Sequence, residues 1–145
     1  YTSTLFDKEG YEEGLHLNLF DGFEDTESYL NFMDSFFGSI DANDLLGMLN
    51  TWQMGDIGKH EKFNNNTKKA LANINCPALV MPSSTDLSFP ARNNIPEVNE
   101  MSDAELIVIN TKHGHLAGGM STALTSQEDV TFIDKNIKEF LKKIT

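Results

Sequence analysis

Two polar segments that could carry chemistry each follow a short apolar run. Residues 83–86 follow the apolar run 78–81 and end in Asp86, and residues 110–115 follow the run 105–109 and end in His115. Because functional residues of an open α/β sheet collect at the carboxyl ends of its strands, we expect Asp86 and His115 to share one edge of a sheet. A carboxylate fixes the tautomer of a neighbouring imidazole and stabilises the imidazolium formed when it accepts a proton. The two residues are therefore candidates for the acid and the base of a catalytic pair.

A second histidine offers a different chemistry for the same loop. His113 and His115 form a His-x-His pair, and Asp86 could complete a trio of metal ligands. A metal site needs three or four ligands with a clear geometry, so we favour His113 as a loop residue beside the site and expect no metal. His16 and His60 are expected to face solvent.

The elements that must position these residues lie in the second half of the chain. Residues 78–81 and 105–109, which are apolar apart from Glu105, suit strands that are buried on both faces. A short helix is expected before the first strand, a second over residues 94–101 with Pro96 in its first turn, and a third with an apolar stripe. That stripe comprises Ile133, Ile137, Phe140, Leu141 and Ile144. This order predicts a parallel sheet with right-handed crossovers, and further strands should flank it, since two strands alone are not stable.

The first half has helical patterns and no convincing strand. One helix is expected over residues 26–37, with Thr26 as N-cap and Gly38 as its end, and another begins at Asp41 and carries Trp52 on an apolar face. Both helices are apolar over most of their girth and must be covered by the rest of the fold or by another subunit. We therefore expect residues 1–62 to form a helical lid and residues 63–145 to form the part of the core that carries the acid and the base.

Composition narrows the class of protein. The 145 residues fit one domain, and their net charge of −11 would repel nucleic acid and anionic lipid. No segment is long and apolar enough to span a membrane, and no signal peptide is visible. The single cysteine, Cys76, cannot form an internal disulfide, and we expect it to be buried. A cytoplasmic protein is indicated, and the start at Tyr1 suggests that further sequence precedes it.

Several motifs, in the right order, resemble the homoserine O-acetyltransferase-like group of the α/β-hydrolases. Residues 41–46 (DANDLL), 51–53 (TWQ) and 55–57 (GDI) are similar to that group's lid helices. Residues 77–82 (PALVMP), 85–87 (TDL) and 89–90 (FP) are similar to its strand and acid loop, and residues 114–118 (GHLAG) to its histidine loop. The resemblance covers roughly residues 39–145.

The resemblance implies an α/β fold, specifically the C-terminal part of an α/β-hydrolase preceded by a helical lid. It also implies a serine-dependent acyl-transfer enzyme in which Asp86 orients His115 and His115 is the general base and acid. Its partners would be a small-molecule acyl donor, such as acetyl-CoA, and a hydroxyl acceptor, with no metal or tightly bound cofactor. A homodimer through the lid helices is a further expectation.

The sequence departs from that group in two ways. The residue after the triad histidine is an aspartate that helps to hold the substrate amine in true homoserine acetyltransferases, whereas here it is Leu116. An apolar side chain cannot pair with an ammonium group, so ester hydrolysis stays open. No Gly-x-Ser-x-Gly nucleophile elbow occurs in the chain, and Ser39 lacks the strand–turn–helix context of one. We therefore expect this chain alone to be inactive, as a fragment of the enzyme.

A non-catalytic protein is the alternative. A remnant of the α/β-hydrolase fold could use its apolar lid helices for dimerisation or partner binding, and the absence of a nucleophile favours this hypothesis. Retention of both Asp86 and His115 at neighbouring strand ends argues against it.

Overall fold

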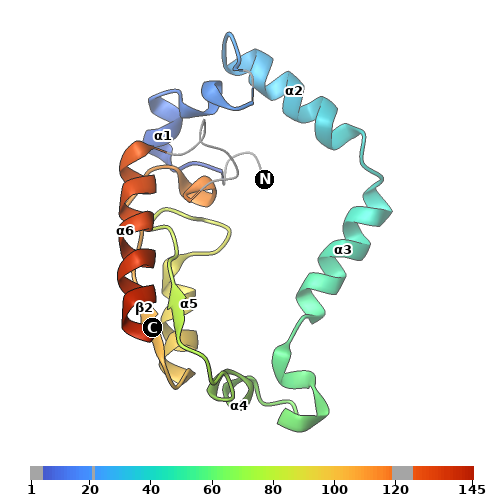
Figure 1. Cartoon of the computed structure of the whole chain (residues 1–145). Coiled ribbons are helices and arrows are strands. Elements are labelled where there is room, and N and C mark those ends of the chain that lie inside the picture. Colours follow the sequence, from blue (N-terminus) through green and yellow to red (C-terminus); the bar gives the residue numbers. More distant parts are fainter. Residues whose placement is uncertain (1–4, 21, 119–125) are drawn as a thin grey trace.

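The computed structural model describes residues 5–20, 22–118 and 126–145, in which helices alternate with two short strands (Figure 1). Short 3-10 helices accompany the longer elements. The α-helices and strands are, in chain order, α1 (Lys8–Glu12), α2 (Thr26–Gly38), α3 (Ala42–Met54), α4 (Thr67–Ala72), β1 (Ala78–Val80), α5 (Ala91–Glu100), β2 (Ala104–Leu106) and α6 (Gln127–Ile144). The predicted order of helix, strand, helix, strand and helix in the second half is confirmed.

The two strands pair in parallel, as predicted, and their pairing extends beyond the regular strands. Ala78 lies opposite Ala104 and Val80 opposite Leu106. The backbone N–H of Ile109 then donates to the carbonyl of Pro82 at 2.8 Å, and the N–H of Ser84 donates to the carbonyl of Ile109 at 2.8 Å. This extended pairing carries the chain directly into the two polar segments at the carboxyl ends of the strands.

In the second half of the chain, α5 packs against β2 and α4 packs against α5. α6 runs beside the strands, and Lys143 near its end forms an ion pair with Glu105 of β2 at 2.7 Å (Figure 1). The prediction for α5 needs a correction, because the helix begins at Ala91 and Pro96 is its sixth residue rather than part of its first turn. Proline has no N–H to donate to the carbonyl four residues earlier. The helix tolerates this loss because it is short and none of its residues is buried.

The helices α2 and α3 form an arch that stands away from the strands (Figure 1). The N-cap of α2 is Asp25 and not Thr26 as predicted, because the Asp25 carboxylate reaches the backbone N–H of Ser28 at 2.8 Å and completes a capping box. Asp41 caps α3 as expected, and none of the residues of α3 is buried. The homodimer expected through these helices stays a prediction, as does the lid boundary at residue 62.

The buried core lies where α2 begins, beside the loop that carries His115. It unites a segment before α1, one face of α2 and the residue after His115. The cluster comprises Leu5, Phe6, Leu19, Tyr29, Met33 and Leu116. The N-terminal segment is therefore packed directly against the loop that carries the candidate base.

Two further expectations about single residues were wrong. His16 does not face solvent: it is 4% exposed and lies between the rings of Tyr11 and Tyr29, each with its centroid 5.1 Å away. Its Nε2 contacts the Thr26 hydroxyl at 3.1 Å. Cys76 is exposed rather than buried, because it lies in the connection before β1 and not in the strand. His60 is exposed, as expected.

No helix in the described part of the chain is both long and apolar enough to cross a bilayer.

The burial of His16 predicts a pH dependence of stability. Burial lowers the pKa of His16 below its ordinary value of 6.5. As the pH falls, His16 therefore binds a proton in the unfolded chain before it does so in the folded chain. The contribution of His16 is therefore complete above about pH 6.5 and is lost as the pH falls toward the lowered pKa of the folded state. Chemical denaturation at about pH 8 and about pH 5 measures how much the free energy of unfolding falls in acid. This fall should be smaller for His16→Gln than for the wild type. The exposed His60→Gln is the control and should keep the wild-type fall; an unchanged fall in His16→Gln would contradict the prediction.

Candidate active site

Asp86 and His115 lie side by side at the carboxyl ends of the two paired strands. His115 Nδ1 is 3.0 Å from Asp86 Oδ2, within hydrogen-bond distance. The side chain of Asp86 is 11% exposed and that of His115 is 26% exposed, so both are largely shielded from solvent. The structure therefore brings together the two residues that the sequence selected, and their catalytic roles stay a prediction.

The loop after β1 fixes the orientation of the Asp86 carboxylate. Its Oδ1 accepts hydrogen bonds from the backbone N–H groups of Ser88 at 2.7 Å and Phe89 at 2.9 Å. One carboxylate oxygen is thus held by the backbone of its own loop, and the other is left to accept from His115. Hydrogen bonds from backbone N–H groups to a carboxylate are charge-assisted and comparatively strong, so Asp86 is pre-oriented before any substrate arrives.

The histidine loop is fixed by the N-terminal segment. The N–H of His115 donates to the carbonyl of Leu5 at 3.0 Å. Gly114 has a φ of 52°, in the left-handed region, and a Cβ there would lie 2.6 Å from the Leu5 carbonyl oxygen. Only glycine meets both conditions without displacing backbone. The approach of Leu5 to the loop is therefore part of what sets the position of the imidazole.

A chain of aromatic contacts leads from the imidazole to the lid. The ring of Phe89 lies 5.5 Å from that of His115, and Trp52 of α3 meets Phe89 edge-on at 5.7 Å. Phe89, His115 and Asp86 also line a pocket of about 250 Å³, together with Asn94 of α5. Trp52 was expected to be part of the core or of the lid surface; it is 69% exposed, yet it contacts a residue that lines the site.

His113 belongs to a separate group of polar residues. Its Nδ1 lies 3.0 Å from the Thr111 hydroxyl and 3.4 Å from Asp129 Oδ2, while Asp86 is occupied by His115. The two histidines thus face different carboxylates, and no metal-binding group of three or more histidine, cysteine, aspartate or glutamate residues is found among the described residues. This arrangement gives the alternative metal site no support.

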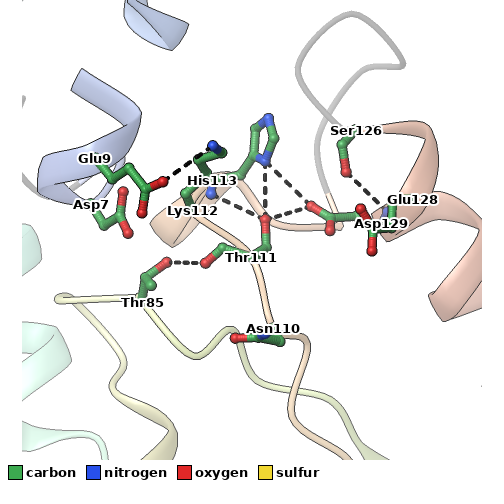
Figure 2. Close-up of a pocket in the computed structure, with 10 residues that line it drawn as sticks. All are labelled: Asp7, Glu9, Thr85, Asn110, Thr111, Lys112, His113, Ser126, Glu128 and Asp129. Carbon is green, nitrogen blue, oxygen red and sulfur yellow. Dashed lines mark hydrogen bonds and ion pairs between the residues drawn. The ribbon is translucent and has the colours of Figure 1, made fainter. Parts of the chain in front are cut away.

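Some residues around the pair were not singled out from the sequence. Asp129 is 5% exposed in the first turn of α6, and Thr85 and Thr111 join the acid loop to the histidine loop (Figure 2). An acidic residue in the first turn of a helix is common for electrostatic reasons alone. The sequence therefore did not mark Asp129 as part of a site. Ser39, already set aside as a nucleophile, is exposed and donates its hydroxyl to the Phe36 carbonyl at the end of α2.

Leu116, the residue that departs from the homoserine acetyltransferase pattern, faces the core. It is 7% exposed and packs in the cluster with Leu5 and Phe6. Its side chain is thus part of the packing that supports the histidine loop.

The known proteins that match this chain in sequence are ester hydrolases. No protein-family model matches the chain. A probable esterase from Corynebacterium glutamicum is 36% identical over 122 residues, which are 83% of this chain and 33% of that protein. An ethyl acetate hydrolase from Pseudomonas veronii is 32% identical over 109 residues, which are 74% of this chain and 30% of that protein. The chain thus spans about a third of the length of these curated relatives.

Solved structures agree with this result. An acetylester hydrolase from Corynebacterium glutamicum superimposes with a TM-score of 0.75 and 32% identity over 97% of this chain and 38% of that chain. The acetyl esterase MekB superimposes with a TM-score of 0.74 and 28% identity over 97% of this chain and 39% of that chain. The chain is therefore similar in fold to part of these esterases, with the parallel strands of an α/β arrangement. The predicted resemblance to homoserine O-acetyltransferases has no counterpart among these relatives.

The close packing at Gly114 predicts different outcomes for two glycine substitutions. Gly114→Ala should lower the free energy of unfolding by about 1–3 kcal/mol, because the new methyl group meets the Leu5 backbone at an unfavourable φ. Gly47→Ala is the matched control, since a Cβ at Gly47 has no neighbour within 4 Å inside α3. It should raise stability by about 0.5–1 kcal/mol. Equal effects of the two variants in denaturant titrations would refute this account of the histidine loop.

Proposed function

We propose that this chain supplies the acid and the base of a serine-dependent ester hydrolase that acts on acetate esters and similar short-chain esters. The observation that carries the proposal is the 3.0 Å contact between His115 Nδ1 and Asp86 Oδ2 at the ends of two paired parallel strands. The kinship with esterases supports the reaction class.

In this mechanism the proton of a serine hydroxyl passes to His115. The Nδ1–H of His115 is held by Asp86, which leaves Nε2 as the nitrogen that accepts the proton. The serine oxygen forms a bond to the ester carbonyl carbon, and the imidazolium is stabilised by the Asp86 carboxylate. When the tetrahedral intermediate collapses, the bond to the alcohol oxygen breaks and His115 returns its proton to the leaving alcohol.

The second half of the reaction repeats these steps with water. His115 accepts a proton from water as the water oxygen attacks the acyl-serine carbonyl carbon. The bond to the serine oxygen then breaks, the acid is released, and the proton returns to serine. Asp86 stays ionised throughout and keeps the imidazole in the required tautomer.

The nucleophilic serine and the oxyanion donors are proposed to come from sequence outside these 145 residues. No Gly-x-Ser-x-Gly motif occurs in the chain, and in α/β-hydrolases that motif precedes the acid and the histidine in chain order. The matched segments make up only 33% and 30% of the two curated relatives. The proposed chemistry needs no metal or tightly bound cofactor.

Transfer of an acetyl group from acetyl-CoA to a hydroxyl acceptor is the second candidate function. The motifs of the lid, the acid loop and the histidine loop favour it. Leu116 argues against homoserine as the acceptor, because this side chain is buried in the core and has no charge to pair with an ammonium group. Water is therefore the acceptor that we favour.

Removal of the base or its orienting carboxylate should abolish turnover. In the full-length protein that contains this chain, we expect His115→Ala and Asp86→Asn each to lower kcat on p-nitrophenyl acetate by roughly ten-thousand-fold. His60→Ala changes an exposed histidine that does not line the pocket beside the pair, and it should keep wild-type activity. Activity of His115→Ala within a few-fold of the wild type would sink the triad assignment and favour the non-catalytic remnant.

The two acyl acceptors can be separated by following the product. With acetyl-CoA or ethyl acetate as the donor and homoserine present in excess, we expect acetate to be released and no O-acetylhomoserine to form. Mass spectrometry of the products distinguishes the two outcomes. Accumulation of an O-acetylated acceptor at the rate of donor consumption would instead establish a transferase.

A further inference from the structure

Thr85 lies at a point where one hydroxyl group touches both loops of the candidate active site. It directly precedes Asp86 in the chain. Its Oγ1 donates to the carbonyl of Thr111 at 2.7 Å and accepts from the N–H of Gly114 at 3.1 Å. Gly114 directly precedes His115. A single side chain thus connects the backbone next to the acid with the backbone next to the base.

The position of Thr111 is itself fixed by two further contacts. Its N–H donates to the Ser84 hydroxyl at 3.2 Å, and its own hydroxyl donates to Asp129 Oδ2 at 2.6 Å (Figure 2). Asp129 is buried in the first turn of α6, where its N–H donates to the Ser126 hydroxyl. The network therefore anchors the histidine loop to the longest helix of the chain.

The same network orders the backbone between Thr111 and Gly114. The N–H of His113 donates to the Thr111 hydroxyl at 3.1 Å, and the His113 ring lies against Asp129 (Figure 2). The Thr85 hydroxyl completes the arrangement, because it donates to the Thr111 carbonyl and accepts from the Gly114 N–H. The Ser84 hydroxyl also donates to the Thr111 carbonyl, at the longer distance of 3.3 Å, but it makes no contact with Gly114. A hydroxyl can serve both because it donates one proton and accepts through its lone pairs.

We infer that Thr85 is a positioning residue that sets the separation of Asp86 and His115, an inference that rests on the proposed ester hydrolase function. The acid and the base come from loops 29 residues apart, and a catalytic pair loses rate steeply when it is displaced by about 1 Å. Thr85 acts through its hydroxyl, and its methyl group is dispensable for this role.

The test compares Thr85→Val, which keeps the shape and removes the hydroxyl, with Thr85→Ser, which keeps the hydroxyl. In the full-length protein, kcat on p-nitrophenyl acetate should fall by about 10- to 100-fold in Thr85→Val, with KM within about three-fold of the wild type. Thr85→Ser should keep kcat within about three-fold. Thr131→Val is the matched control, because its exposed hydroxyl also donates to a backbone carbonyl, that of Gln127, within α6; it should match the wild type.

A second measurement does not depend on turnover. An imidazole N–H bound to a carboxylate gives a proton resonance far downfield, and the Nδ1–H of His115 should give one that His115→Ala removes. Thr85→Val should broaden or shift this resonance, and Thr85→Ser and Thr131→Val should preserve it. Should Thr85→Val not fold, Thr85→Ala removes the same hydroxyl without a new methyl group and carries the same expectations.

The outcomes separate the inference from the proposed function. A folded Thr85→Val or Thr85→Ala protein with wild-type kcat and an unchanged resonance would overturn the positioning role. Loss of activity in Thr85→Ser equal to that in Thr85→Val would also overturn it, since the hydroxyl would then not be the group that matters. Absence of ester hydrolysis in the wild type, with a resonance that still responds to Thr85→Val, would refute the proposed function and leave the positioning role standing.

Discussion

The parallel pairing of the segments that include β1 and β2 is the constraint on which the rest of this structure depends. Its hydrogen bonds continue past the regular strands to Pro82, Ser84 and Ile109. Parallel strands run in the same direction, so both chains leave the pairing at the same edge. Asp86 and His115 therefore need only short loops to meet, although 29 residues separate them. A shift in register of these strands would separate the pair without altering either residue.

Pairing alone does not define the geometry of the histidine loop, which is held from three sides. The N-terminal segment contributes the Leu5 carbonyl, the acid loop contributes the Thr85 hydroxyl, and α6 contributes the Asp129 carboxylate. These contacts are mostly to backbone atoms, and their partners lie far apart in sequence. Several neighbours thus fix the same backbone conformation, in which Gly114 occupies the left-handed region that glycine adopts without strain.

The sequence pointed to Asp86 and His115 because each follows a predicted strand and because an acid and a histidine have a recognised joint chemistry. The resemblance of the segments around them to the acid and histidine loops of a known family then favoured the pair over two ordinary loop residues. The sequence did not point to Thr85, Asp129 or His16. A threonine before an aspartate and an aspartate near a helix start are both common for local reasons, and their partners lie 26 and 18 residues away. His16 stands between two leucines in the segment 15–20 (LHLNLF), and only the tertiary fold places it between two tyrosines.

The contact between Trp52 and Phe89 has an optical consequence. Trp52 is the single tryptophan of the chain, so all indole fluorescence of these residues comes from one side chain. One ring, that of Phe89, lies between this indole and the His115 imidazole. The exposed position of Trp52 in α3 makes the emission sensitive to solvent and to quenchers. The chain thus carries a native spectroscopic reporter in contact with a residue that lines its candidate active site.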